Sequence, residues 1–254
     1  NNSNGSLVFG AGNEITNSIT SISGAPTSGG DNPNALRNSV KDAVKVAKGG
    51  GATMALGGGN KADYTLRTSM IGINNTVTGA NGAESADNFV AGVGNTGTNV
   101  QHLTAIGSKN TVSDANNTVI VGDNRKVTGA NNSVIIGSSD AETTTTVNDA
   151  VAIGHNTEVS AEGGVALGSE SKTTTAAGVQ GYNPASDRTN KYSTQAGAVG
   201  TSTLAAVSVG NGTTATRQIT GLAAGTEDTD AVNVAQLKNV NLKYAGDTGN
   251  SDVL

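Results

Sequence analysis

The stretch TVIVGDNRKVTGANNSVIIG, residues 118–137, contains the same phrase twice. An apolar triplet closed by glycine occurs at 119–122 and again at 134–137. A polar segment with a Thr-Gly-Ala-Asn turn signal at 128–131 separates the two copies. Because the apolar run is too short for a helix and alternates with period two, it predicts a β-strand that returns at a regular interval.

The same phrase recurs along most of the chain. Its closing glycines are Gly10, Gly57, Gly72, Gly107, Gly122, Gly137, Gly154 and Gly168, with a degenerate copy at 89–92. Five positions after some of these glycines stands a second apolar residue, at Ile15, Val77, Val112, Val127 and Val159. Two short strands and two turns in about 15 residues form one coil of a parallel β-solenoid, in which each coil pairs with its neighbours. The chain is therefore predicted to be all-β, a parallel β-roll of stacked rungs.

Each triplet presents two apolar faces. We expect the residue before the glycine, such as Val121, and the residue two positions earlier, Val119, to fill the inside of the roll. The middle residues of the triplets would then face the opposite way, at Met70, Ala105, Ile120, Ile135, Ala152 and Ala166. Since a single roll would expose this second apolar row to water, we expect copies of the chain to cover it.

Composition narrows the class of protein. Aromatic residues are 2% of the 254 residues, charged residues are 14%, and cysteine is absent. Small side chains must therefore fill a thin core, and disulfides and cysteine-based metal or redox sites are excluded. The formal net charge of −5 gives no basic excess for nucleic acid, and no run of 18 apolar residues could span a membrane.

Residues 217–240, RQITGLAAGTEDTDAVNVAQLKNV, closely resemble the neck of the trimeric autotransporter adhesins, the YadA-like surface proteins of Gram-negative bacteria. The phrases AVAIG at 150–154 and GVALG at 164–168 are similar to the head repeat of that family, and the loop at 181–195 resembles its irregular head segment. The resemblance implies a homotrimeric head of left-handed parallel β-rolls, joined by a neck to a coiled coil. It also implies that the protein is exposed from the outer membrane at the bacterial cell surface.

The resemblance also implies a division of the chain. The β-roll head would span 1–205, the last head coil and neck 206–240, and the start of a following stalk module 241–254. The neck residues packed near the threefold axis would be Val232, Val234, Leu237 and Val240. Spacing in 229–243 is compatible with a helix, for which Asp228 or Thr229 is the expected cap.

Residues 20–51 interrupt the rungs and predict a helix within about 31–51. Asn32 is its expected cap, Pro33 its first residue and Gly49 its stop. Beside an apolar stripe the segment carries four cations, Arg37, Lys41, Lys45 and Lys48. Two interpretations stay open: a solvated face on a helix that caps the roll, or a ligand patch for sialylated or sulfated glycans or acidic proteins.

Residues suited to catalysis are scarce. The two histidines, His102 and His155, lie in different coils and have no further ligand at metal-binding spacing, so we expect surface or inter-rung hydrogen bonds. The acidic group at 227–230 lacks the spacing of a calcium-binding loop. We therefore predict a protein that is not an enzyme and that uses no cofactor or metal.

The predicted function is a bacterial surface adhesin head. Its partners would be a host matrix protein, a cell-surface receptor or glycan, or other bacterial cells, bound through a trimeric multivalent surface. One alternative is a trimeric fibre of a phage or a secreted fibre with a spacer role. A left-handed β-helix acyltransferase is disfavoured, because such enzymes repeat every six residues, whereas these coils repeat near 15.

Overall fold

The computed structural model describes residues 3, 5–18, 33–34, 37–38, 41–42, 51–182 and 200–239. The chain divides into two compact units. The first comprises Asn1–Ala176 and Leu204–Thr216, and the second comprises Ala177–Thr203 and Arg217–Leu254. The first unit contains every strand of the roll.

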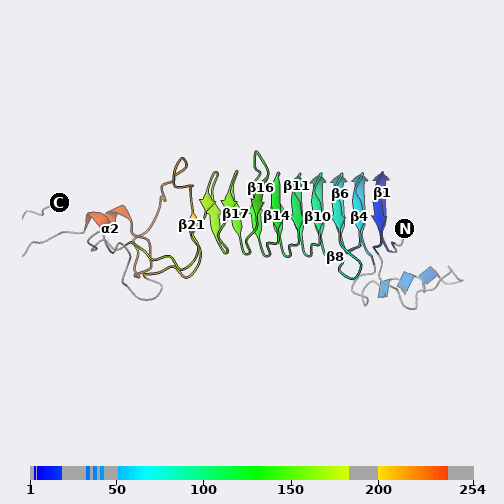
Figure 1. The fold of residues 1–254 in the computed structure, drawn as a ribbon, viewed down its shortest axis with the longest axis horizontal. Coiled ribbons are helices and arrows are strands. Elements are labelled where there is room, and N and C mark those ends of the chain that lie inside the picture. Colours follow the sequence, from blue (N-terminus) through cyan, green and yellow to red (C-terminus); the bar gives the residue numbers. More distant parts are fainter. Residues whose placement is uncertain are drawn as a thin grey trace, which may run out of the picture. The chain divides into compact units, whose positions relative to one another are not determined.

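One face of the roll is a ten-stranded parallel sheet, whose strands lie side by side in chain order (Figure 1). In order they are β1 (Leu7–Ala11), β3 (Met54–Gly58), β6 (Ser69–Ile73), β9 (Phe89–Val93), β11 (Thr104–Ser108), β13 (Val119–Val121), β15 (Val134–Ile136), β17 (Val151–Ile153), β19 (Val165–Leu167) and β21 (Val207–Ser208). Each strand pairs in register with the next copy of the phrase, so that Ile120 lies beside Ile135.

The other face is a seven-stranded parallel sheet. Its strands are β2 (Glu14–Thr16), β4 (Lys61–Asp63), β7 (Thr76–Thr78), β10 (Thr96–Thr98), β12 (Thr111–Ser113), β14 (Arg125–Thr128) and β16 (Thr143–Thr145). Two short parallel pairs complete the coils, β5 (Thr65–Leu66) with β8 (Ser85–Ala86) and β18 (Glu158–Val159) with β20 (Lys172–Thr173). The predicted parallel β-roll is confirmed: each of the first seven rungs contributes one strand to each main sheet, and later rungs continue the ten-stranded sheet.

The predicted assignment of faces within the triplet is wrong. Ile120 and Ile135, the middle residues of their triplets, are buried at 0% and 1% exposure. The residues before the glycines, Val121 and Ile136, are 38% and 41% exposed. Because side chains alternate along a strand, a one-residue error in the starting face exchanges the two rows completely. The small core is built from the middle residues and the second-strand residues, among them Val77, Val112 and Val127.

Glycine closes each phrase because two constraints coincide there. Gly72 has a φ of +125°, a backbone conformation that L-residues avoid. A Cβ on Gly72 would also lie 2.0 Å from the carbonyl oxygen of Gly92, in the next rung. The glycines therefore form a column in which the backbones of successive rungs approach closely.

A row of asparagines lies three residues after the rung glycines. This asparagine ladder comprises Asn13, Asn60, Asn75, Asn95 and Asn110. In the ladder, Nδ2 of Asn95 donates to Oδ1 of Asn75 (3.0 Å) and to the carbonyl oxygen of Gly107 (2.7 Å). Asn95 is 1% exposed, so these bonds satisfy an amide that would otherwise be costly to bury. The recurrence was visible in the sequence, but the interior position of the row was not predicted.

The second unit contains the short helix α2 (Val234–Lys238). Its N-cap is Asn233, not the predicted Asp228 or Thr229. The Asn233 side chain accepts from the Gln236 backbone N–H, and the Gln236 side chain accepts from the Asn233 N–H, which completes a capping box. Asp230 instead closes the turn before the helix, since Oδ2 accepts from the N–H groups of Thr226 and Glu227.

Candidate functional site

The ten-stranded sheet carries an exposed apolar row along the roll. This apolar column consists of Phe9, Ile71, Ile106, Val121, Ile136, Ile153 and Leu167, each the residue before a rung glycine. Exposure is 69% for Phe9 and between 36% and 46% for the other six. Because the rungs stack in register at roughly 4.8 Å, the column forms a continuous apolar strip.

Parallel strand pairing aligns the residues of the apolar column. Parallel pairing sets Ile106 beside Val121, and Val121 beside Ile136. After the first rung, where Val8 is 48% exposed, the middle residue of the triplet is buried, so its two neighbours lie on the outer surface of the sheet. A contiguous apolar strip of this kind marks a surface that meets another apolar surface.

The predicted ligand patch is described in part. Arg37 and Lys41 both lie in helical turns and both are exposed. Their spacing of four residues places them on the same side of a helix. Lys45 and Lys48 lie outside the described residues, as does most of the predicted helix at 31–51.

The predicted neck residues are exposed where the structure describes them. Val232, Val234 and Leu237 are 68%, 67% and 66% exposed, while Val240 lies outside the described residues. Val234 and Leu237 lie on α2 three residues apart, a spacing that places them on one helix face. The second unit therefore also presents apolar side chains to solvent.

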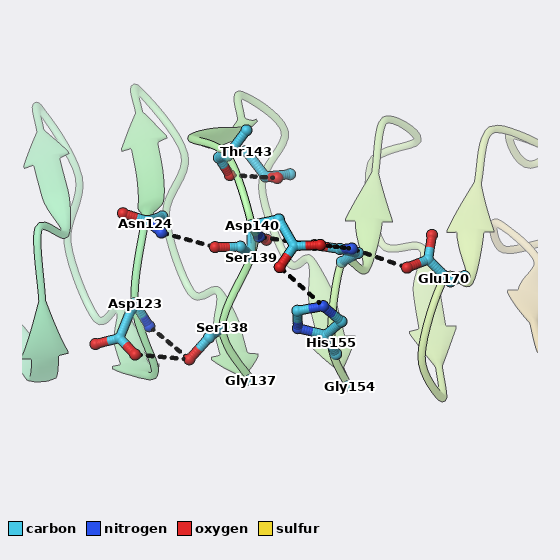
Figure 2. Close-up of polar contacts among 12 residues, drawn as sticks. Asp123, Asn124, Gly137, Ser138, Ser139, Asp140, Thr143, Gly154, His155 and Glu170 are labelled. Carbon is cyan, nitrogen blue, oxygen red and sulfur yellow. Dashed lines mark hydrogen bonds and ion pairs between the residues drawn. The ribbon is translucent and has the colours of Figure 1, made fainter.

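A polar cluster on the surface joins three successive rungs (Figure 2). Nδ2 of Asn156 donates to Asp140 Oδ2 (3.0 Å) and to Glu170 Oε1 (2.8 Å). His155 Nε2 lies 3.4 Å from Asp140 Oδ1, a contact between two rungs of the kind predicted for the histidines. The hydrogen bond from Asn156, followed by the charge of His155, lowers the pKa of Asp140. Within the described ranges, no three His, Asp or Glu side chains could together hold a metal ion.

A second surface contact joins the corners of two rungs. The Arg67 guanidinium binds the Asp87 carboxylate in bidentate fashion, with Nη2 donating to Oδ2 at 2.6 Å. This hydrogen bonding lowers the pKa of Asp87, against an opposing effect of burial. Arg67 and Asp87 both have positive φ values, so the pair braces two strained corners.

Parts of the chain are similar to known proteins. The family described as the coiled stalk of trimeric autotransporter adhesin matches residues 218–254. Autotransporter adhesin BadA of Bartonella henselae is 56% identical over 75 residues, which is 29% of this chain but only 2% of that protein. The crystal structure of the collagen-binding domain of the Yersinia adhesin YadA aligns with 29% identity and a TM-score of 0.39, over 74% of this chain and 73% of that one.

Repeated glycine-closed strands, a parallel roll and a segment that matches the adhesin coiled stalk occur here in one chain. The family match lies at residues 218–254, which follow the last strand of the roll, Val207–Ser208, in the sequence. The chain is therefore similar to the trimeric autotransporter adhesins, above all in the segment that matches their coiled stalk.

Proposed function

We propose that this chain is the head and neck of an adhesin displayed on the bacterial surface. The observation that carries the proposal is the apolar column on the roll, which occurs together with a neck sequence of the adhesin family. The similarity to BadA favours this role over a phage or secreted fibre. Within the described residues, no helix has both the length and the hydropathy needed to cross a bilayer.

We propose that three copies assemble with their apolar columns facing one another. In this arrangement Val232, Val234, Leu237 and Val240 pack near the axis of the neck. The head comprises 1–205, the last coil and neck 206–240, and a stalk module begins at 241. The seven-stranded sheets then face outward, and each ligand contact is present three times, so that weak contacts combine into avidity without a deep pocket or catalysis.

The ligand belongs to the host matrix, to a host cell surface or to another bacterium. The candidate for its recognition is the cationic patch of Arg37, Lys41, Lys45 and Lys48, which contrasts with the net charge of −5 of the whole chain. Acidic glycans or acidic proteins would be attracted to such a patch, and salt would weaken the binding.

A binding screen tests this function. The chain, held trimeric by a fused coiled coil, is measured against collagen, mucin, sulfated and sialylated glycans and epithelial cells, at low and high salt. We expect binding to at least one of these, and salt-sensitive loss of binding when all four patch cations are replaced by Gln. A matched control replaces the same number of cations elsewhere, at Lys61, Lys109, Lys126 and Lys238.

The two outcomes separate the parts of the proposal. Binding that survives in the patch variant but requires the trimer would retain the adhesin and reject the patch. No binding to any matrix, glycan or cell by the trimeric chain would contradict the adhesive role itself.

A further inference from the structure

The asparagine ladder ends at the coil that begins with Gly122. Each ladder residue donates to the carbonyl oxygen of the next rung glycine, as Asn110 does to Gly122 at 2.7 Å. Three residues after Gly122 stands Arg125 in place of asparagine, and three residues after Gly137 stands Asp140. Arg125 is buried at 2% exposure, whereas Asp140 is exposed and takes part in the polar cluster of Figure 2.

The coil that begins at Gly137 is expanded. The strand register sets Thr143 beside Arg125, although Thr143 is six residues after its glycine and Arg125 is three after its own. The additional residues carry Asp140 out to the surface. This coil therefore has no ladder side chain of its own to donate to the carbonyl oxygen of Gly154.

The Arg125 side chain serves both rungs. Its backbone N–H donates to Oδ1 of Asn110 (3.0 Å), which continues the ladder. Nε then donates to the carbonyl oxygen of Gly137 (2.7 Å), the acceptor an asparagine would have served. Nη2 reaches one rung further, to the carbonyl oxygen of Gly154 (3.0 Å) and Oγ1 of Thr157 (3.1 Å). Nη1 donates to the carbonyl oxygen of Thr157 (2.7 Å).

The position is costly to occupy with a charge. All the acceptors named for the guanidinium are neutral carbonyl or hydroxyl oxygens, and burial lowers the pKa of Arg125. A buried cation is tolerated only when its N–H donors are hydrogen-bonded. The planar guanidinium can donate to several acceptors at fixed angles. An asparagine is too short to reach Gly154, two rungs further along the chain.

We propose that Arg125 is a register lock, which joins the asparagine-laddered rungs before it to the rungs that begin at Gly154, where Thr157 and Ser171 take the ladder position. The lock permits the coil at 137–154 to be longer than its neighbours while the rungs on both sides remain aligned. It also frees Asp140 to bind Asn156 and His155 on the surface.

Amide hydrogen exchange on the full 254-residue chain tests the lock. In Arg125→Met, which keeps an unbranched apolar stem but removes the guanidinium donors, we expect the amides of Gly137, Val151 and Gly154 to exchange at least about tenfold faster, which corresponds to ~1.4 kcal/mol. The amides of Phe89 and Thr96, in earlier rungs, should keep their protection. Lys126→Met, on the same strand but directed outward, is the matched control and should change neither group.

The decisive experiment shortens this coil from 17 residues to 14, the step between Gly154 and Gly168. Deleting 141–143 together with Asp140→Asn returns an asparagine to the register position, and adding Arg125→Asn then restores the ladder. We expect Arg125→Asn to be tolerated in the shortened coil and to be destabilising in the native one. If Arg125→Met does not fold, Arg125→Lys is measured instead. Unchanged exchange in the folded Arg125 variant, or equal effects of Arg125→Asn in both coils, would overturn the lock.

Discussion

Glycine at the rung corner is constrained by space as well as by backbone angle, and the two effects can be separated. Gly72 and Gly94 both have positive φ values, +125° and +67°. A Cβ on Gly72 would strike the Gly92 carbonyl oxygen at 2.0 Å, whereas a Cβ on Gly94 would have no atom within 4 Å. The rung glycines are therefore required because the backbones of neighbouring rungs approach closely. At corners such as Gly94, only the positive φ value favours glycine.

We expect Gly94→Ala to cost about 1–2 kcal/mol in free energy of unfolding, the usual penalty for the left-handed region. Gly72→Ala should cost more than about 4 kcal/mol or prevent folding, because backbone of the next rung must move. Thermal unfolding of the two variants measures the difference. Similar melting temperatures would show that the close approach to Gly92 is relaxed at little cost.

The Arg67 and Asp87 pair predicts an acid dependence of stability. Because the pKa of Asp87 is lowered in the folded state, the pair stabilises above the ordinary carboxyl pKa, and this contribution is lost as pH falls through the lowered value. Asp87→Asn keeps a residue that tolerates the positive φ of this corner. We expect Asp87→Asn to be less stable than the native chain at pH 7, and the difference to vanish as pH falls below the lowered pKa of Asp87.

Thermal melts from pH 7 to pH 2 at low and high salt provide this measurement. Both side chains are 34% exposed, so solvent and salt screen the pair and the effect should be small. A double-mutant cycle with Arg67→Gln isolates the pair from other carboxylates. If the difference between the native chain and Asp87→Asn does not vary with pH, the depressed pKa is refuted.

At the scale of the strand, neighbouring residues of one triplet have opposite environments. Ile135 is 1% exposed and lies in the core, and Ile136 is 41% exposed on the apolar column. In the monomeric chain, we expect Ile135→Ala to cost about 2–5 kcal/mol through the cavity it leaves. Ile136→Ala should cost less than about 1 kcal/mol, as is usual for surface changes.

Urea unfolding of both variants, at a concentration where sedimentation shows single chains, checks this order. The pair of substitutions is its own control, because the side chain and the strand are the same. A larger loss for Ile136→Ala would mean that the triplet faces the other way.

At the scale of the whole molecule, the apolar column predicts assembly. Lysines at two of its positions, Ile106→Lys and Ile136→Lys, would bury unpaired charges in the proposed trimer, each costing several kcal/mol. We expect analytical ultracentrifugation to show a fall from three chains to one, with the β-rich circular dichroism spectrum retained. The control, Thr96→Lys with Thr111→Lys on the seven-stranded sheet, should remain trimeric.

The roll and the resemblance to the adhesins could both be predicted from sequence, because each depends on short, continuous segments. The glycine-closed triplets predicted the parallel roll, since each rung pairs only with its neighbours and a short repeat therefore contains the whole fold. The motif at 217–240 likewise lies in one continuous segment, and it predicted the resemblance to the adhesins that the matches to their coiled stalk and to BadA support.

Only the tertiary structure decided which face of the triplet is buried. Apolar residues occupy all three positions in Val119-Ile120-Val121, so alternation alone cannot distinguish inside from outside, and the row predicted to be buried is the exposed one. The role of Arg125 was also invisible, because its acceptors lie 12 to 32 residues away in later rungs. The physical reason is the same in both cases: a solenoid coil is specified locally, but the space inside it is defined only when the next rungs are stacked upon it.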